Sequence, residues 1–379
     1  MGSDKIGLVE ENGAASKVEE KEAEPTKVQN LERMKVLELG TLSTVPMALR
    51  AAIILDVFEI INKVSPTEPI SAKDIVAHIP TTTTKSAVYL DRILKLLASR
   101  EILSDTIVEV DGKKESRYGL TPLCKYLIKD EMGMSLAPLV VMNQDKVFMA
   151  SWQYLPEAVL DGGEPFFKAH GKNAFQLGTE DPRLDKLFNT AMGSHSTLFM
   201  KATLDAYDGF KNISKLVDVG GGFGSSLNMI VSKYPHIQGI NFDQPHVVAL
   251  APQYPGVEHV GGNMFESVPS GEAIFMKWIL HDWSDDHCLT ILKNCYKSVP
   301  DAGKVIVVDA VLPATVDHSL AAKVGYSVDL LMLAYNQGGK ERTEEEFKDL
   351  ALAAGFAGIK VICTIDSMSV LEFYKVLEL

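Results

Sequence analysis

The stretch LVDVGGGFGSS, residues 216–226, decides the fold of the second half of the chain. It starts as a mainly apolar β-strand, and Gly220, Gly222 and Gly224 follow at every second position where the strand ends. Glycine lets the backbone turn sharply there, and the next residues have the apolar spacing of an amphipathic helix. The stretch therefore predicts a strand, a glycine loop and a helix in succession.

The alternation of strand and helix continues along the rest of the sequence. Apolar strands are expected in IQGINFD (237–243), EAIFMKWILH (272–281) and KVIVVDAVLP (304–313), with helices between them. This rhythm predicts an α/β fold with a doubly wound parallel sheet over residues 206–379. The segments IKVICTI and SVLEFYKVLEL supply two more strands, close enough in sequence to pair antiparallel. Ligands of such folds bind beyond the carboxyl ends of the strands.

A glycine-rich loop after a strand is compatible with NAD, with FAD or with a structural turn. The dinucleotide fingerprint G-x-G-x-x-G does not fit. When the motif is counted from Gly222, its third glycine is not in the required place. The pattern that begins at Asp218 instead resembles the first motif of S-adenosylmethionine-dependent methyltransferases. Asp243 ends the next strand, where a carboxylate can accept hydrogen bonds from both hydroxyls of a ribose, although a turn acid or a helix cap would look the same.

Residues 29–130 predict a different, mainly helical unit. Apolar residues recur at helical spacing from 31 to 63, with Pro46 indicating a break, and Ser71 is a suitable N-cap for a later helix. Two short strands are expected around Asp111-Gly112, joined by a polar loop longer than a tight hairpin turn. Helices followed by a hairpin are typical of a winged-helix domain.

This winged-helix-like unit is expected to pack or dimerise rather than to bind DNA. Its candidate recognition helix carries Asp91, Arg92 and Lys95, so it lacks a basic face. The whole chain of 379 residues has a formal net charge of -13, which disfavours nucleic acid and anionic membranes as partners.

Composition sets further expectations for the rest of the chain. Residues 131–205 are expected to be mainly helical, and their many methionine and aromatic side chains fit either a plain core or a ligand pocket. Residues 1–28 are charged and polar, which predicts a disordered tail. The four cysteines show no CxxC spacing, so free thiols in a reducing compartment are expected, and we interpret the protein as cytoplasmic.

Two histidines and three aspartates are concentrated in FMKWILHDWSDDHC, residues 275–288. Ser284 is a suitable helix N-cap, and Asp285 and Asp286 fall in the first turn, where the helix dipole favours negative charge. Successive helical positions point in different directions, so a metal site is the less favoured interpretation. His281 directly follows the apolar strand, on the rim where ligands of this fold bind.

Six motifs occur in order between residues 31 and 379: LVDVGGGFG, KYPHIQGINFDQPHVV, YPGVEHVGGNMF, FMKWILHDWSDDHC, LKNCYKSVPDAGKVIVVDAVLP and GGKERTEEEF. Together they resemble plant O-methyltransferases of the caffeic acid O-methyltransferase type. The resemblance implies a winged-helix dimerisation domain, hence a homodimer, followed by a Rossmann-like class I methyltransferase domain. It also implies methyl transfer from S-adenosylmethionine to a phenolic hydroxyl, without a metal ion.

The resemblance makes His281 the general base and places two acids, Asp309 and Glu341, beside it. A phenol has a pKa near 10, so an imidazole that removes its proton is useful at neutral pH and typically contributes about 10²–10⁴-fold. Neighbouring carboxylates would orient the ring and stabilise its protonated form. Thr343 and Glu346 already form a capping box at the next helix, so capping does not account for Glu341.

The resemblance also implies two sets of binding residues. Those expected to hold S-adenosylmethionine are Asp218, Gly220, Gly222, Asp243, Gln244, Asn263, Met264 and Lys277. Those expected around the acceptor are Met142, Asn143, Phe148, Ala174, Phe188, Met192, Leu331, Met332 and Asn336. The second set is an apolar sleeve with few polar groups, which suits a flat aromatic acceptor of either the phenylpropanoid or the benzylisoquinoline alkaloid type.

Three residues depart from the family pattern. Asp309 stands where glutamate is usual, and its shorter side chain is expected to bind His281 less directly. Asn263 replaces an acid near the cofactor adenine, but its amide oxygen can still accept a hydrogen bond, so binding is expected to persist. Gly178 stands where phenylpropanoid-methylating relatives carry a bulkier histidine, which leaves room for a larger acceptor.

Two other functions fit parts of the sequence. A non-catalytic nucleoside-binding dimer partner of a related methyltransferase is favoured by Asp309 and Asn263, whereas the intact His281 and Glu341 argue against it. A Mg²⁺-dependent catechol methyltransferase would need a carboxylate cluster, and the sequence shows no convincing one. Activity that survives EDTA distinguishes the two kinds of enzyme.

Overall fold

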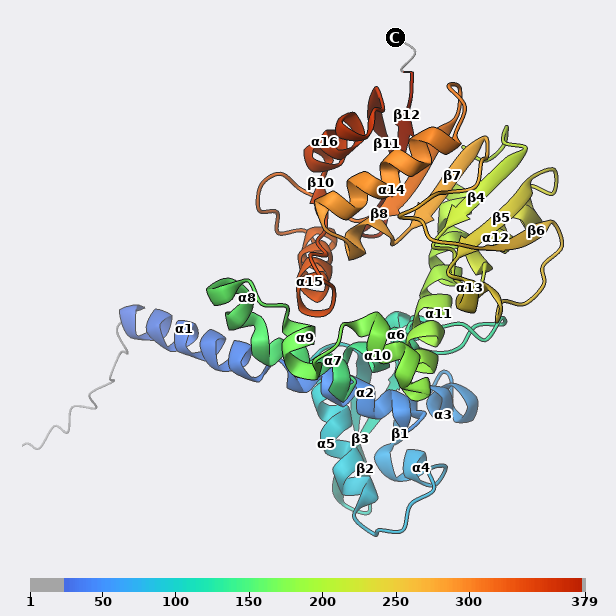
Figure 1. The fold of residues 1–379 in the computed structure, drawn as a ribbon. Helices are drawn as coiled ribbons and strands as arrows, with labels where there is room; N and C mark the ends of the chain where they lie inside the picture. The colour runs from blue at the N-terminus through green and yellow to red at the C-terminus, as the bar shows by residue number, and fades with distance from the viewer. Residues whose placement is uncertain (1–23, 377–379) are drawn as a thin grey trace, which may run out of the picture. The chain divides into compact units, whose positions relative to one another are not determined.

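The computed structural model describes residues 24–376, with side chains from residue 29. The chain divides after Pro46 into two compact units. The first contains α1 (Glu24–Thr41) and the start of α2 (Thr44–Ile54) (Figure 1). The helix α1 begins at Glu24, so the predicted tail of residues 1–28 overlaps its start. Residues 1–23 of that tail lie outside the described residues.

The helix α1 carries apolar side chains that the described chain leaves more than half exposed. They are Leu31, Met34, Val36, Leu37 and Leu39. No single helix among the described residues is long and apolar enough to cross a membrane, although α1 from Gln29 and α2 reach that length and apolarity together, across a bend of 42°. Exposed apolar surface of this extent is typical of a protein interface.

The break predicted at Pro46 is confirmed, but it lies just upstream of the proline. The helix α1 ends at Thr41 and α2 begins at Thr44, so Pro46 occupies the first turn of α2, where its missing N–H is no loss. A second break follows at Asp56, whose φ of 54° is left-handed and which precedes α3 (Val57–Val64).

The second unit begins with helices packed on a small sheet. The sheet has the order β1-β3-β2, with β1 at Ile70–Ser71, β2 at Leu103–Val110 and β3 at Lys113–Leu120. The helices that contact it are α3, α4 (Ala72–Val76) and α5 (Ser86–Ser99). Ser71 caps α4 as predicted, in a capping box with Asp74. The winged-helix assignment itself stays a prediction.

The hairpin of this sheet corrects a prediction. Val110 pairs with Lys113, so the connection is a two-residue turn and not a longer polar loop. Asp111 and Gly112 both have positive φ, 51° and 71°. This is the turn that the right-handed twist of two antiparallel strands favours, and the Asp-Gly pair was its signal.

The region predicted to be helical is mainly helical. Its elements are η1 (Pro122–Tyr126), α6 (Ala137–Asn143), α7 (Lys146–Ser151), η2 (Trp152–Tyr154), α8 (Leu155–Asp161), α9 (Pro165–His170), α10 (Ala174–Glu180) and α11 (Pro182–Ala206). Side chains of α6, α7, α9 and α11 form one apolar cluster with Ala334 and Tyr335 of α15 (Leu320–Tyr335). The many methionine and aromatic residues therefore do supply a core.

Seven strands form the large sheet, in the order β11-β12-β8-β7-β4-β5-β6. The strands are β4 (Lys215–Val219), β5 (Gln238–Asp243), β6 (Val257–Gly261), β7 (Ala273–Lys277), β8 (Lys304–Asp309), β11 (Gly358–Ile365) and β12 (Met368–Tyr374). The pairs among β4 to β8 are parallel, and β12 runs antiparallel to β8 and β11. The predicted doubly wound sheet and its antiparallel end are confirmed.

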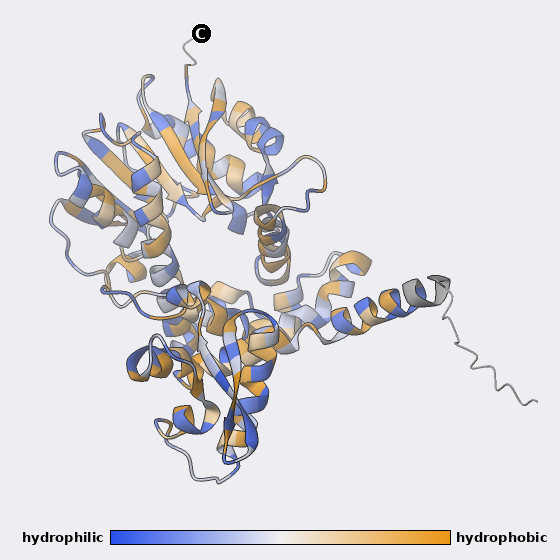
Figure 2. Cartoon of the chain, turned by 180° about the vertical axis from the view of Figure 1, so that it is seen from behind, coloured by the Kyte–Doolittle hydropathy of each residue, from blue (hydrophilic) through white to orange (hydrophobic). Residues whose placement is uncertain are grey.

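The two faces of this sheet bury separate cores, because side chains alternate along each strand. Val305 and Val307 join a cluster with α14 (Asp285–Ser298) and α16 (Glu344–Ala354). Ile306 and Val308 join another with α11 and α12 (Ser225–Lys233). Figure 2 shows orange, hydrophobic stretches in the strands of the large sheet. The remaining elements are α13 (Pro245–Val248) and the short parallel pair of β9 (Val311–Leu312) and β10 (Arg342–Thr343).

The order of the strands fixes where a ligand can bind. From β4 the chain continues outward through β5 and β6, and it then returns to the other side of β4 with β7 and β8. The carboxyl ends of β4 and β7 therefore border the switch point at which ligands of doubly wound sheets bind.

Candidate active site

The glycine loop lies between β4 and α12. Gly220, Gly222 and Gly224 have φ of 70°, 56° and 80°, a conformation that favours glycine. The backbone N–H of Gly220 donates to the Phe242 carbonyl at 2.8 Å, and that of Gly222 donates to Asp243 Oδ2 at 2.8 Å. The loop is thereby bound to the end of β5.

Gly221 is a loop residue that the every-second-position pattern missed. A Cβ at this position would lie 2.1 Å from Asn241 Oδ1 and 2.7 Å from Asp218 Oδ2, so no larger residue fits without a shift. Asn241 is fully buried on β5, and its Nδ2 donates to the Gly222 carbonyl at 2.8 Å. Its place as the middle one of three consecutive glycines was the only signal in the sequence.

Asp218 on β4 and Lys277 at the end of β7 carry opposite charges that influence each other's pKa. Asp218 is 2% exposed and its Oδ2 has no hydrogen-bond partner within the described chain. Burial raises the pKa of Asp218 to about 7, against the opposing charge of Lys277. Burial also lowers the pKa of Lys277 to about 8, while Asp309 and Asp218 oppose the change. A buried oxygen without a protein partner is able to accept a hydrogen bond from a ligand.

The other predicted cofactor residues lie along the next strand ends. Asp243 uses both oxygens, since Oδ1 accepts from the N–H of Gln244 at 2.6 Å. Asn263 Oδ1 accepts from the N–H of Phe265 at 3.1 Å, and its Nδ2 donates to Glu266 at 3.0 Å. Met264 packs against the core that contains α14. A carbonyl or carboxylate oxygen can accept a second hydrogen bond, so these groups keep acceptor capacity.

His281 lies four residues beyond β7, on the short 3₁₀ helix η3 (Leu280–Asp282), and not directly at the strand end as predicted. Its Nδ1 is 2.6 Å from Glu341 Oε1, and both side chains are buried. Burial alone would disfavour the charged ring, but the carboxylates of Glu341 and Asp282 outweigh it and raise the pKa of His281 to about 9. The arrangement is an imidazole held by a carboxylate.

Asp282 is a site residue that the sequence analysis missed. Its Oδ1 lies 3.6 Å from His281 Nε2 and accepts a 2.6 Å hydrogen bond from Asn336 Nδ2. Burial raises the pKa of Asp282 to about 6, although the His281 charge opposes the change. The sequence analysis explained the two neighbouring aspartates, Asp285 and Asp286, as first-turn residues of α14 and assigned no role to Asp282.

Asp309 is the last residue of β8 and is fully buried, but it makes no direct contact of hydrogen-bond length with His281. Both its oxygens lack a hydrogen-bond partner in the described residues. Burial raises its pKa, and the positive charge of His281 opposes that change.

Trp278 and His195 complete the surroundings of the base. Trp278 has a φ of 56°, rare for a residue other than glycine, and this turn separates β7 from η3. The His195 ring stacks on Trp278 with 4.0 Å between centroids, and His195 Nδ1 is buried without a described partner. Burial lowers the pKa of His195 to about 3, so this ring stays neutral. Nothing in the sequence singled out His195.

The Ser284 prediction needs a correction. Ser284 stands at the N-cap of α14, but its side chain bonds His287 Nδ1 at 2.8 Å and makes no capping bond to the helix backbone. By contrast, Thr343 and Glu346 form the predicted capping box of α16. That box fixes the segment just after Glu341.

The nine residues predicted around the acceptor are here called the acceptor wall. Five of them belong to the apolar cluster between α6, α7, α10, α11 and α15, namely Met142, Phe148, Ala174, Met192 and Leu331. Met332 lies in the last turn of α15 and Asn336 directly follows that helix; Asn336 Nδ2 lies 3.4 Å from Met332 Sδ and also donates to Asp282. Asn143 ends α6, and Phe188 is 37% exposed on α11.

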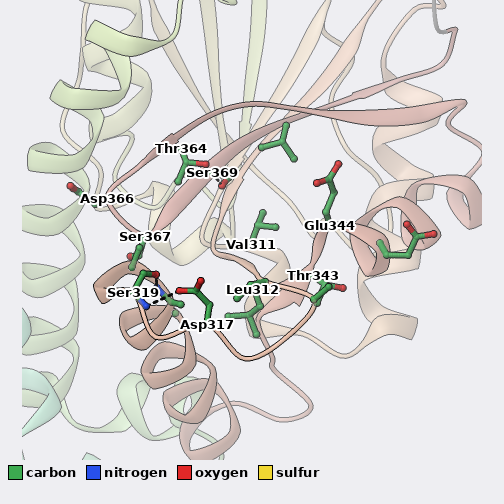
Figure 3. A pocket seen from close by; sticks show the side chains of 17 residues that line it. Val311, Leu312, Asp317, Ser319, Thr343, Glu344, Thr364, Asp366, Ser367 and Ser369 are labelled. Carbon is green, nitrogen blue, oxygen red and sulfur yellow. Dashed lines mark hydrogen bonds between the residues drawn. The ribbon is translucent and has the colours of Figure 1, made fainter.

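A cavity of about 610 Å³ lies away from these residues (Figure 3). Its lining includes Val311, Asp317, Thr343, Glu344 and Ser369, and none of the predicted site residues, all of which are described. Its Thr364 and Ser369 hydroxyls bond each other at 2.8 Å. Among the described residues, no group of three or more histidine, cysteine, aspartate or glutamate side chains could hold a metal ion.

Two protein-family models match the chain. An O-methyltransferase domain matches residues 152–357, and an O-methyltransferase dimerisation domain matches residues 37–130. The caffeic acid 3-O-methyltransferase of Prunus dulcis is 54% identical over 353 residues, which are 93% of this chain and 97% of that protein. O-methyltransferase 13 of Lophophora williamsii is 55% identical over 334 residues, 88% of this chain and 92% of that protein.

Solved structures extend this similarity to the fold. The crystal structure of CalO1, a methyltransferase in calicheamicin biosynthesis, in its SAH-bound form, has a TM-score of 0.76 to this chain. It shares 26% sequence identity, and the match covers 91% of this chain and 98% of that chain.

Proposed function

The chain belongs to the O-methyltransferase family that includes the plant caffeic acid 3-O-methyltransferases, and from this we propose that it methylates a phenolic hydroxyl of a plant aromatic metabolite with S-adenosylmethionine as donor. The observation that carries the proposal is the 2.6 Å contact between His281 and Glu341, on the edge of the sheet that also holds the glycine loop. The donor supplies a methyl group activated by a positive sulfonium.

The residues of the glycine loop fit this donor. Gly220 and Gly222 bring backbone close to a ligand, Asp243 has acceptor capacity for ribose hydroxyls, and the unpaired Asp218 oxygen suits a further polar group. Gln244, Asn263, Met264 and Lys277 would line the rest of this site. Asp243 is bound through both oxygens to backbone N–H groups, so it is already oriented.

His281 would act as the general base through Nε2. Glu341 faces Nδ1, which places the ring proton on that nitrogen in the neutral ring and leaves Nε2 free to accept. With a pKa of about 9 for His281, proton transfer from a phenol with a pKa near 10 is nearly balanced, and the neutral fraction of the ring that can accept the proton grows as pH rises toward 9. Glu341 would stabilise the imidazolium, and Asp309 would add a more distant negative charge.

The acceptor wall suits a flat aromatic molecule. Its apolar cluster offers contact area, while Asp282 and Asn336 offer polar groups next to the base. Similarity to the caffeic acid 3-O-methyltransferases favours a phenylpropanoid acceptor. Gly178 favours a bulkier acceptor, such as a benzylisoquinoline alkaloid, because no atom lies within 4 Å of a Cβ built there.

The enzyme would be a cytosolic homodimer that needs no metal ion. The dimerisation-domain match over residues 37–130 and the exposed apolar side chains of α1 support a twofold interface. Four free cysteines, three of them buried, suit a reducing compartment. Light scattering should give twice the 41.5 kDa of one chain, and a fully active particle of one chain's mass would contradict the dimer.

The direct test is an acceptor panel with methyl-labelled S-adenosylmethionine. We expect label on a phenolic oxygen of at least one phenylpropanoid or alkaloid, with activity that EDTA does not change. Tight binding of S-adenosylmethionine without transfer to any panel member would favour the non-catalytic dimer partner. Loss of transfer in EDTA, restored by Mg²⁺, would favour a metal-dependent enzyme.

A further inference from the structure

We propose that Arg342 is a positioning residue for His281, which it serves by fixing the backbone of the turn that carries the imidazole. The inference rests on the proposed function, because it takes His281 to be the base. Arg342 itself is remote from the reacting atoms in this account and acts only through that turn.

The guanidinium of Arg342 holds the turn from both sides of His281. Its Nη1 donates to the Leu280 carbonyl at 2.9 Å, and its Nη2 donates to the Trp283 carbonyl at 2.8 Å. These two carbonyls bracket the pair His281-Asp282. Two directed bonds from one rigid, planar group leave the short helix η3 little freedom to shift or rotate.

Other bonds anchor Arg342 to the surrounding elements. Its Nε and Nη2 donate to Asp285 Oδ1 at 3.0 and 2.8 Å, at the start of α14. Its backbone pairs with Val311 in the β9–β10 ladder, and the N–H of Lys340 donates to the His281 carbonyl at 2.9 Å. The turn is therefore tied to the segment that supplies Glu341, the residue before Arg342.

Glu341, which contacts the base, and Arg342, which holds the turn, are neighbours in one short segment. Glu341 contacts His281 Nδ1, and its own N–H donates to Asp329 Oδ1 of α15 at 2.9 Å. Arg342 is 0% exposed, and burying a guanidinium is costly unless its donors are satisfied. Two of its five side-chain hydrogen bonds go to carbonyls of the turn at the base, where a displacement of about 1 Å can cost about 10²-fold in rate.

A double-mutant cycle in kcat tests the proposal. Arg342→Met and Arg342→Lys are each made in the natural chain and in a His281→Gln background, with S-adenosylmethionine affinity and thermal unfolding measured alongside. We expect Arg342→Met to lower kcat by about 10–100-fold, with Arg342→Lys less severe and donor affinity within about threefold. In the His281→Gln background the same changes should lower kcat by less than about twofold, because the residue acts through the missing base.

The matched control is Lys340→Met. Lys340 Nζ binds Asp285, at 3.1 Å, and Glu346, at 3.0 Å, but it makes no bond to the carbonyls of the turn. This change should leave kcat within about twofold. A comparable loss in Lys340→Met would show that ion pairs in this segment, and not the bonds from Arg342 to the turn, set the rate.

The outcomes separate this inference from the proposed function. Equal fold-losses from Arg342→Met with and without His281 would overturn the positioning role and leave the base assignment intact. Near-normal kcat in the His281→Gln single variant would overturn the base assignment itself. If Arg342→Met does not fold, Arg342→Lys carries the same cycle, and failure of both to fold would overturn the proposal in favour of a purely structural residue.

Discussion

Different interactions hold two regions of the molecule in place. One is the region at the carboxyl ends of the strands, here called the sheet edge, and the other is the acceptor wall. At the sheet edge, directed bonds of 2.6 and 2.8 Å fix His281 on Glu341 and Gly222 on Asp243. In the wall, side chains such as Met142, Phe148 and Met192 are held by apolar packing. Directed bonds specify one geometry, whereas apolar cores tolerate swaps of similar volume. The chemistry should therefore depend on single atoms, and the choice of acceptor on shape.

The sharpest test of this contrast is His281→Gln. Because the base is lost while the fold and the loop remain, kcat should fall by about 10²–10⁴-fold with donor affinity nearly unchanged. Single-turnover methyl transfer and calorimetry measure the two quantities. The exposed His236, changed to glutamine, is the control and should keep full activity. A His281→Gln enzyme with near-normal turnover would remove the basis for the comparison.

Asp243→Asn should act on donor binding. The substitution removes a charge that accepts from two backbone N–H groups and from the proposed ribose hydroxyls, so the affinity for S-adenosylmethionine should fall by about 10–100-fold. At saturating donor, kcat should recover. Calorimetry that shows unchanged affinity would exclude Asp243 from the donor site.

Gly221→Ala should have a smaller effect in the same region. The added Cβ overlaps buried Asn241 and Asp218, and overpacking of this kind costs about 1–3 kcal/mol, so donor affinity should fall by about tenfold. Gly40→Ala is the control, because no atom lies within 4 Å of its Cβ position on α1. Equal donor affinity in both variants would mean that the glycine loop accommodates the added methyl group with no loss of binding free energy.

Phe188→Ala probes the acceptor wall and should have the smallest effect. Phe188 is already 37% exposed, so its loss should leave the fold intact and raise the acceptor KM by about 3–10-fold, with donor affinity unchanged. Steady-state kinetics with both substrates separate these terms. A large loss of kcat would mean that the wall is as geometrically exacting as the sheet edge.

The two regions also differ in how well the sequence predicts them. Part of the sheet edge could be predicted from local signatures, because Gly222 and Asp243 lie where strands end, whereas Glu341 was predicted only through the resemblance to a family. Asp282 was missed because the aspartates of this stretch were interpreted as a group, and the start of α14 explains its neighbours Asp285 and Asp286. His195 was missed because its stack on Trp278 depends on α11 meeting the end of β7, a contact that no local pattern encodes.

Backbone detail shows the same limit. The hairpin at Asp111-Gly112 was predicted too long, although the pair is the standard signal for a two-residue turn. The left-handed Trp278, which moves His281 onto η3, had no signal at all, since tertiary contacts and not glycine hold that φ of 56°. Local patterns thus predict which strands and turns occur better than they predict the backbone conformation of a single residue.

The pH dependence of kcat/KM in the natural chain and in Glu341→Gln tests the central claim most directly. His281 must be neutral to accept a proton, and its pKa is raised to about 9, so log kcat/KM should rise with a slope of about one as pH increases toward that value. Removing the Glu341 carboxylate lowers the pKa of His281, so the rise should move to lower pH and its plateau should fall. The acceptor's own ionisation is the same with both enzymes and cannot produce that shift. A flat profile in the natural chain, or a rise that Glu341→Gln leaves in place, would contradict the account of His281 as a base held by Glu341.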